Sequence, residues 1–195
     1  MRIENNYSVK AHNTFGINQI TKRFIEYSSA DELKELIKSG KLEQPFFHIG
    51  AGSNLLFVDD YEGTLLHSAI CYIHPVKETK DEVWVSVGAG TCWDDFVAHC
   101  VEKEWYGVEN LSLIPGEVGS AAVQNIGAYG VEVKDLLVSL KAINLLTGEE
   151  REFSNAECQY DYRYSCFKQP EMKVWAVVEV TFKLSKQPTF NLTYK

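Results

Sequence analysis

Two glycine-rich loops are the first candidates for binding chemistry. The loop Gly50-Ala51-Gly52-Ser53-Asn54 follows an apolar run, and Gly88-Ala89-Gly90-Thr91 follows another 38 residues later. Residues without Cβ let backbone N–H groups approach an anion closely, so a phosphate is the obvious ligand. Neither loop is a dinucleotide-binding fingerprint, since Leu55 and Trp93 occupy the third glycine positions, and no Walker Lys-Ser/Thr follows. A tight turn without a ligand is the alternative for each loop.

Small residues dominate the segment 113–130, which contains four glycines and four alanines or serines in 18 residues. So little side-chain bulk indicates that another group packs closely against this backbone. Gln124 and Asn125 carry amides of the kind that bind the edge of a planar heterocycle, and Tyr129 offers a flat face or a hydroxyl. A small-residue helix that crosses a sheet explains the same composition and stays open as the alternative.

A third candidate is the segment Tyr160-Asp161-Tyr162-Arg163-Tyr164-Ser165, where one guanidinium stands among three phenols beside a hydroxyl. Arginine can hold a carboxylate or phosphate through two hydrogen bonds and can stack on aromatic rings. The alternative is a strand-end arginine whose charge pairs with Asp161.

The elements that must position these residues are a mixture of helices and strands. A helix is expected from Ser29 to Gly40, with Ser29 and Glu32 as a capping box, and a second from Thr91, capped with Asp94, to near Gly107. The apolar face predicted for this second helix consists of Trp93, Phe96, Val97, Cys100 and Val101.

Strands outnumber helices in the second half of the chain. Strands are predicted at 46–49, 83–87, 135–146, 149–153 and 174–184. Polar stretches with proline or glycine punctuate the chain at 40–45 and 73–81. We therefore expect a boundary near residue 72, which separates one subdomain at 1–72 from a second at 73–195.

Composition limits the classes of partner. A net charge of -8, a pI near 5.2 and the lack of a Lys/Arg cluster argue against nucleic acid and against an acidic membrane surface. The five cysteines include no Cys-x-x-Cys pair, and the histidines show no metal-ligand spacing, so we expect buried thiols in a reducing compartment and no metal. Without a signal peptide or an apolar membrane span, a soluble cytoplasmic protein is expected.

Taken together, the motifs resemble those of the UDP-N-acetylenolpyruvoylglucosamine reductases, also called UDP-N-acetylmuramate dehydrogenases. The resemblance covers nearly the whole chain in order, and the Ile-Pro-Gly to Gly-Ala-Tyr-Gly block with the Tyr-Arg-x-Ser segment is its most specific part. The matching motifs are Asn13-Thr14-Phe15-Gly16, Gly52-Ser53-Asn54, Gly107-Val108-Glu109-Asn110-Leu111, Ile114-Pro115-Gly116, Gln124-Asn125-Ile126-Gly127-Ala128-Tyr129-Gly130, Tyr162-Arg163-Tyr164-Ser165-Cys166-Phe167-Lys168 and Leu192-Thr193-Tyr194.

The resemblance implies an α+β, two-subdomain FAD-binding fold of the vanillyl-alcohol-oxidase (PCMH) type, with FAD clamped between the subdomains. The pyrophosphate is expected on Gly50, Ala51, Gly52, Ser53 and Asn54. The rest of the flavin site is expected to be lined by Ile114, Pro115, Gly116, Ser120, Gln124, Asn125, Gly127 and Tyr129. Ala51 replaces the family's usual glycine, a change that the loop should tolerate.

In the family reaction, NADPH is the co-substrate and hydride passes through FAD to the enolpyruvyl double bond of a UDP-sugar. Hydride addition needs a fixed cation to polarise the neighbouring carboxylate, and the resemblance assigns this catalytic role to Arg163. It assigns substrate contacts to Tyr162 and Tyr194. The family's proton-donating serine, second catalytic carboxylate and substrate-binding domain have no counterparts here, so we expect a truncated polypeptide that is inactive alone.

Two other functions remain open. A related flavin dehydrogenase or oxidase would need a different segment from Tyr162-Arg163-x-Ser165. A non-catalytic module could keep the fold for binding, with or without a flavin. No obligate protein partner is implied by either reading.

Overall fold

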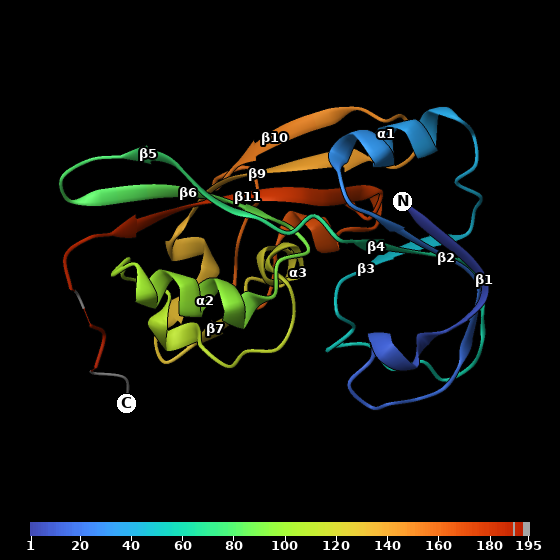
Figure 1. Cartoon of the computed structure of the whole chain (residues 1–195), viewed down its shortest axis with the longest axis horizontal. Helices are drawn as coiled ribbons and strands as arrows, with labels where there is room; N and C mark the ends of the chain where they lie inside the picture. Colours follow the sequence, from blue (N-terminus) through green and yellow to red (C-terminus); the bar gives the residue numbers. More distant parts are fainter. Residues whose placement is uncertain (189, 193–195) are drawn as a thin grey trace.

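The computed structural model describes residues 1–188 and 190–192, and these residues form two main β-sheets flanked by helices (Figure 1). The first sheet has the order β1-β2-β4-β3. Its strands are β1 Arg2–Ser8, β2 Ile20–Tyr27, β3 Phe46–Ile49 and β4 Tyr61–Ser68. β1 pairs antiparallel with β2, whereas β4 lies parallel to both β2 and β3.

The second sheet is antiparallel throughout and has the order β10-β9-β11-β6-β5. Its strands are β5 Ile73–Glu78, β6 Glu82–Gly88, β9 Leu137–Asn144, β10 Glu150–Ser154 and β11 Trp175–Ser185. The helices α2 Trp93–Glu102 and α3 Val118–Gln124 lie on one face of it (Figure 1). Phe182 of β11 contacts Trp93 and Phe96 of α2, so aromatic packing fixes this helix on the sheet.

Short elements connect these layers. The strands β7 Gly127–Ala128 and β8 Val131–Glu132 form a small hairpin. Five 3₁₀ turns complete the described elements: η1 Val9–His12, η2 Glu109–Leu111, η3 Val133–Asp135, η4 Cys166–Lys168 and η5 Pro170–Met172.

The two sheets share part of one hydrophobic core. Helix α1, Ala30–Lys38, buries Leu33 and Leu36 in a cluster that includes Leu66 of the first sheet together with Ile143 and Val178 of the second. Removing either sheet would therefore expose apolar surface of the other, at a cost of roughly 25 cal/mol per Å². The sheets change between Ser68 and Ile73, where the sequence predicted a boundary. The division into subdomains 1–72 and 73–195 stays a prediction.

The first predicted helix is confirmed, with one change at its cap. The Ser29 side chain accepts from the Glu32 backbone N–H at 3.1 Å, and Gly40 follows the helix at φ +67°. The Glu32 carboxylate, however, accepts from the backbone N–H of Ser28, not from that of Ser29, so the capping box is only half formed.

The prediction for the second helix was wrong at both ends. Its N-cap is Cys92, because the Thr91 hydroxyl lies at hydrogen-bond distance from the Tyr72 backbone instead of capping the helix. It ends at Glu102, short of Gly107. Val101, placed on the apolar face from the sequence, is 54% exposed.

The expectation of buried thiols holds for Cys100, Cys158 and Cys166 but not for Cys71 and Cys92, which are exposed. Within the described residues, no helix has the length and apolar character needed to cross a bilayer. The same part of the chain contains no cluster of His, Cys, Asp or Glu able to hold a metal ion.

Candidate functional site

The first glycine-rich loop has unused backbone donors. It follows β3, and none of the N–H groups of Ala51, Gly52, Ser53 and Asn54 donates a hydrogen bond to an acceptor within residues 1–188 and 190–192. Gly52 has φ +73°, and a Cβ there would lie 1.8 Å from the His12 carbonyl oxygen, so the loop is tightly packed on one side. Four successive donors on such a loop fit an anionic group.

The second glycine-rich loop behaves differently. The N–H groups of Ala89, Gly90 and Thr91 donate to the carbonyl oxygens of Val178, Ile70 and Gly88 respectively. A Cβ at Gly88 or Gly90 would clash with backbone oxygen at 2.2 or 2.1 Å. These glycines allow close backbone packing, so the tight-turn alternative describes this loop.

The small-residue block, which includes α3 on the second sheet, contacts the first glycine-rich loop. Gly116 has φ +131°, and a Cβ on it would lie 3.3 Å from Ser120 Oγ and 3.5 Å from Ser53 Oγ. The Ser53 hydroxyl donates to the Pro115 carbonyl at 3.3 Å. A Cβ at Gly50 would lie 3.0 Å from Ser120. Predicted site residues from both halves of the chain thus meet at the start of α3.

Helix α3 packs closely on the second sheet, because a Cβ on Gly119 would lie 2.8 Å from that of Ala89. The small-residue helix on a sheet, one of the two interpretations of this block, is therefore present. It does not displace the binding interpretation, since Gly116 and Ser120 face the first loop while Gly119 faces the sheet. Ile114, which also belongs to the predicted flavin site, packs against the core at the edge of this helix.

Asn125 ends α3 in the left-handed conformation, at φ +46°, and its side chain is fully buried. Its Nδ2 donates to Glu132 Oε2 at 3.1 Å and to the Asp161 carbonyl at 2.9 Å. Its Oδ1 accepts from the Lys134 N–H at 3.1 Å. All these partners belong to the chain, so this amide holds three segments together, whereas Gln124 beside it is only half-buried.

Arg163 and Tyr162 form the tip of a tight hairpin closed by two backbone hydrogen bonds between Asp161 and Tyr164. Tyr162 is 77% exposed. The Arg163 guanidinium donates to the Gly127 carbonyl at 3.0 Å, and the Lys168 ammonium donates to the Arg163 carbonyl at 2.7 Å. No ion pair with Asp161 is present among the described residues, so that alternative for Arg163 is not observed.

The other predicted aromatic residues lie at the margins of this region. Tyr129, at φ +49° in the β7–β8 turn, is 63% exposed, and its carbonyl accepts from the Asn110 amide at 3.0 Å. Tyr129 lies two residues after Gly127, whose carbonyl accepts the hydrogen bond from Arg163. Tyr194 lies outside the described residues.

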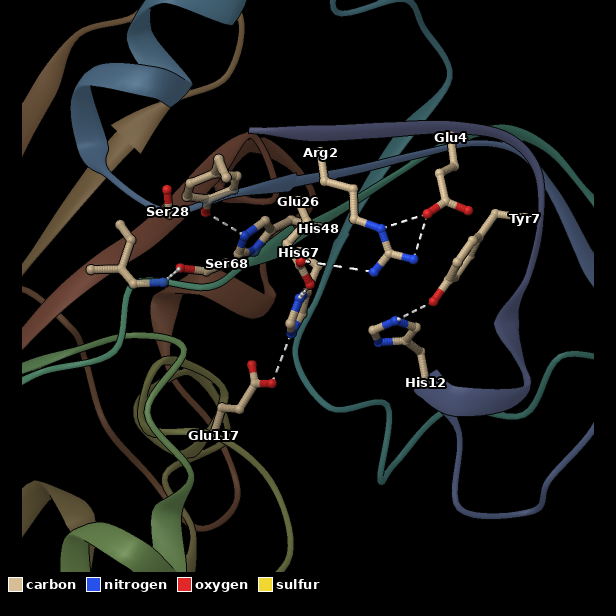
Figure 2. Close-up of polar contacts among 12 residues, drawn as sticks. Arg2, Glu4, Tyr7, His12, Glu26, Ser28, His48, His67, Ser68 and Glu117 are labelled. Carbon is tan, nitrogen blue, oxygen red and sulfur yellow. Dashed lines mark hydrogen bonds and ion pairs between the residues drawn. The ribbon is translucent and has the colours of Figure 1, made fainter.

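The sequence did not single out Glu26, His67 and Glu117, which the fold brings together beside the first loop (Figure 2). Glu117 is the N-cap residue of α3 and forms a capping box with Ser120, whose hydroxyl accepts from the Glu117 N–H at 3.2 Å. The signals available were Glu117 three residues before Ser120 and His67 directly after the apolar pair Leu65 and Leu66.

Comparisons with known proteins identify the family of the chain. Residues 21–154 match the FAD binding domain family, and the chain belongs to that family. A UDP-N-acetylenolpyruvoylglucosamine reductase of Bacteroides fragilis (strain YCH46) is 56% identical over 192 residues, covering 98% of this chain and 58% of the relative. A protein of the same name from Porphyromonas gingivalis (strain ATCC 33277) is 45% identical, covering 100% of this chain and 58% of the relative.

The solved structures lead to the same class. The UDP-N-acetylenolpyruvylglucosamine reductase of Thermus caldophilus superposes with a TM-score of 0.78 at 27% identity, covering 96% of this chain and 64% of that chain. An alkyldihydroxyacetonephosphate synthase shares the fold alone, with a TM-score of 0.62 at 13% identity, covering 87% of this chain and 32% of that one. The predicted α+β flavin-binding fold and the predicted family resemblance are confirmed. The chain spans about 58% of the length of the curated relatives.

Proposed function

We propose that the chain is the flavin-binding part of an NADPH-dependent UDP-N-acetylenolpyruvoylglucosamine reductase, which forms UDP-N-acetylmuramate for peptidoglycan precursors. The observation that carries the cofactor site is the run of four unused N–H donors at Ala51–Asn54, placed against Gly116 and Ser120. The relatives' names support the reaction. The substrate, the co-substrate and the cytoplasmic location belong to this proposal.

FAD, when bound, supplies the group that accepts hydride from NADPH and passes it on. The residues of the chain bind and orient it. The Gly50–Asn54 loop would hold the diphosphate through its N–H groups. Gln124 ends α3, and Gly127 and Tyr129 follow it. The C-terminal end of this helix lies about 10 Å from its N-terminal end at 1.5 Å per residue. These three residues would contact the part of FAD that lies beyond the diphosphate. Asn125 would act by fixing this backbone, since its amide is fully used within the chain.

Arg163 is proposed as the catalytic cation. Its hydrogen bond to the Gly127 carbonyl fixes the guanidinium beside the cofactor end of the site, and the exposed side chain retains further donors for a carboxylate. A fixed positive charge there would stabilise negative charge that develops when hydride adds to the enolpyruvyl group. Tyr162, at the same hairpin tip, and Tyr194 are proposed substrate contacts.

Cofactor binding is tested by titrating FAD into the chain and following flavin absorbance and fluorescence. Ser53→Glu puts a carboxylate into the loop and should weaken FAD binding by about tenfold or more, which is about 1.4 kcal/mol. Ala98→Glu adds the same charge at an exposed position of α2 and should leave the affinity unchanged. Equal FAD affinities in the two variants would refute the proposal that the diphosphate binds to this loop.

The reaction is tested in a chimera that continues the chain with the remaining part of the Bacteroides fragilis relative. Arg163→Met should lower kcat roughly a hundredfold or more for NADPH oxidation coupled to the UDP-sugar enolpyruvate. Arg151→Met removes an exposed arginine paired with Glu157 and is the matched control. A chimera that binds FAD but oxidises NADPH only with another acceptor would indicate a related dehydrogenase. A folded chimera without FAD would indicate a non-catalytic module.

A further inference from the structure

A carboxylate–imidazole–carboxylate bridge joins the two halves of the fold beside the first glycine-rich loop (Figure 2). His67 lies on β4, and its Nδ1 is 2.9 Å from Oε2 of Glu26 on β2. Its Nε2 is 2.8 Å from Oε1 of Glu117, the N-cap residue of α3. The side chains of His67 and Glu117 are each 12% exposed. The imidazole is therefore a largely buried link between the first sheet and α3.

The geometry sets the protonation state of this ring. A neutral imidazole has one donor and one acceptor nitrogen, whereas an ionised carboxylate only accepts. Both contacts are hydrogen bonds only if both ring nitrogens carry hydrogen. Burial by itself lowers the pKa of His67, but the hydrogen bonds and charges of Glu117 and Glu26 outweigh it and raise that pKa. His67 therefore stays positively charged to higher pH than a free histidine.

Other ionisable groups surround the bridge. Arg2 of β1 lies 4.0 Å from Glu26 and is also paired with Glu4. The ring centroid of His12, from η1, is 5.0 Å from that of His67.

Burial and the charge of His67 lower the pKa of His12. The same two causes lower the pKa of His48, on β3, to about 4. Cys71 is exposed as a residue, but partial shielding of its thiol from solvent and the two bridge carboxylates raise its pKa, and Cys92 pairs through its backbone with Glu117. His12 and His48 therefore lose their protons at lower pH than His67, which leaves His67 as the histidine of this group with a raised pKa.

The bridge bears on the cofactor site through Glu117. Oε2 of Glu117 lies 3.2 Å from the position of a Cβ on Gly50, the first residue of the loop with four unused N–H donors. An unneutralised carboxylate at this place repels an anion on the loop. The His67 imidazolium both fixes this carboxylate and offsets its charge.

We propose that His67 is a positioning residue for the FAD diphosphate, so that FAD is held tightly while His67 is an imidazolium and is released as His67 loses its proton. The proposal rests on the FAD site of the proposed function and not on the reductase reaction. Loss of the proton turns one of the two hydrogen bonds into a contact between lone pairs. The Glu117 charge is then no longer offset, and the link between β4 and α3 weakens.

The test combines the His67 pKa, measured by NMR titration, with the dissociation constant for FAD from about pH 6 to about pH 9.5. In the wild-type chain we expect the dissociation constant to rise at least tenfold, with a midpoint at the His67 pKa. His67→Gln should bind FAD weakly at every pH, with a flat profile. Glu117→Gln keeps a side chain able to cap α3 and removes the charge, so it should bind tightly with a flat profile.

Glu26→Gln is the matched control, because it removes the other carboxylate without changing the charge beside the loop. It should retain the pH dependence with its midpoint moved to lower pH. A flat wild-type profile with normal FAD binding, or an unchanged slope in His67→Gln, would overturn the inference alone. A folded wild-type chain that binds no FAD at any pH would overturn the proposed function as well.

Discussion

Replacing Asn125 by alanine should destabilise the chain by about 4 kcal/mol. The substitution removes hydrogen bonds to Glu132, to the Asp161 carbonyl and from the Lys134 N–H, all of which Asn125 makes with a fully buried side chain. Each such bond contributes about 1 kcal/mol, which gives about 3 kcal/mol for the set. Alanine at φ +46° adds about 1 kcal/mol of backbone strain.

A glycine at the same position separates the two contributions. Asn125→Gly loses the hydrogen bonds without the strain, so it should cost about 3 kcal/mol, about 1 kcal/mol less than alanine. Gln124→Ala is the matched control, since the Gln124 amide makes no hydrogen bond within the described residues and alanine favours a helix. Its cost should stay within about 0.5 kcal/mol.

The assay is equilibrium unfolding in urea, followed by tryptophan fluorescence and circular dichroism, with the same m-value required in all variants. A cost below about 1.5 kcal/mol for Asn125→Ala, or a glycine variant as stable as the wild type, would refute the reasoning that this amide fixes the end of α3. FAD binding by Asn125→Ala, where the variant is still folded, then reports how far the cofactor site depends on that backbone.

Three further predictions concern glycine packing, pH and thiol exposure. Gly52→Ala should unfold the chain or cost more than about 4 kcal/mol, because a Cβ would lie 1.8 Å from a carbonyl oxygen. Gly40 has a similar positive φ but open space around it, so Gly40→Ala should cost about 1 kcal/mol in the same urea assay. The pKa of His67 is higher in the folded chain than in the unfolded chain, so its stabilising contribution should be complete below about pH 6.5 and be lost as the pH rises through the folded pKa. His67→Gln should remove this pH dependence from the free energy of unfolding. Cys71 and Cys92 should react with a thiol reagent in the native chain and the three buried cysteines only after unfolding; modification of all five at one rate would contradict the burial described.

Much of the local structure follows from the residue pattern alone. Ser29 with Glu32, followed by Leu33 and Leu36, predicts α1 because cap and apolar spacing agree. Alternating Val83, Val85 and Val87 predict β6 in the same way. The buried face of α2 could not be fully predicted by this means, because Val101 fits the apolar spacing but is 54% exposed in the fold.

The candidate site divides in a similar manner. The sequence alone determined which segments carry glycine, small residues, amides and the arginine, because motif chemistry depends on residue type and order. It could not distinguish the two glycine-rich loops, since both have the same spacing, and only the fold determines which N–H groups are already used by carbonyl oxygens of distant strands.

Tertiary structure alone decided the partners of side chains far apart in the chain. Asn125 carries an amide of the kind that binds ligands, yet it is buried and makes three hydrogen bonds within the protein, so it fixes the backbone at the end of α3. His67 lies 41 residues from Glu26 and 50 from Glu117, and nothing local pairs them. The pairing of β2 with β4 places Glu26 opposite His67, and the packing of α3 beside this sheet brings Glu117 to the other ring nitrogen. Burial there makes the protonation of a single ring matter to the site.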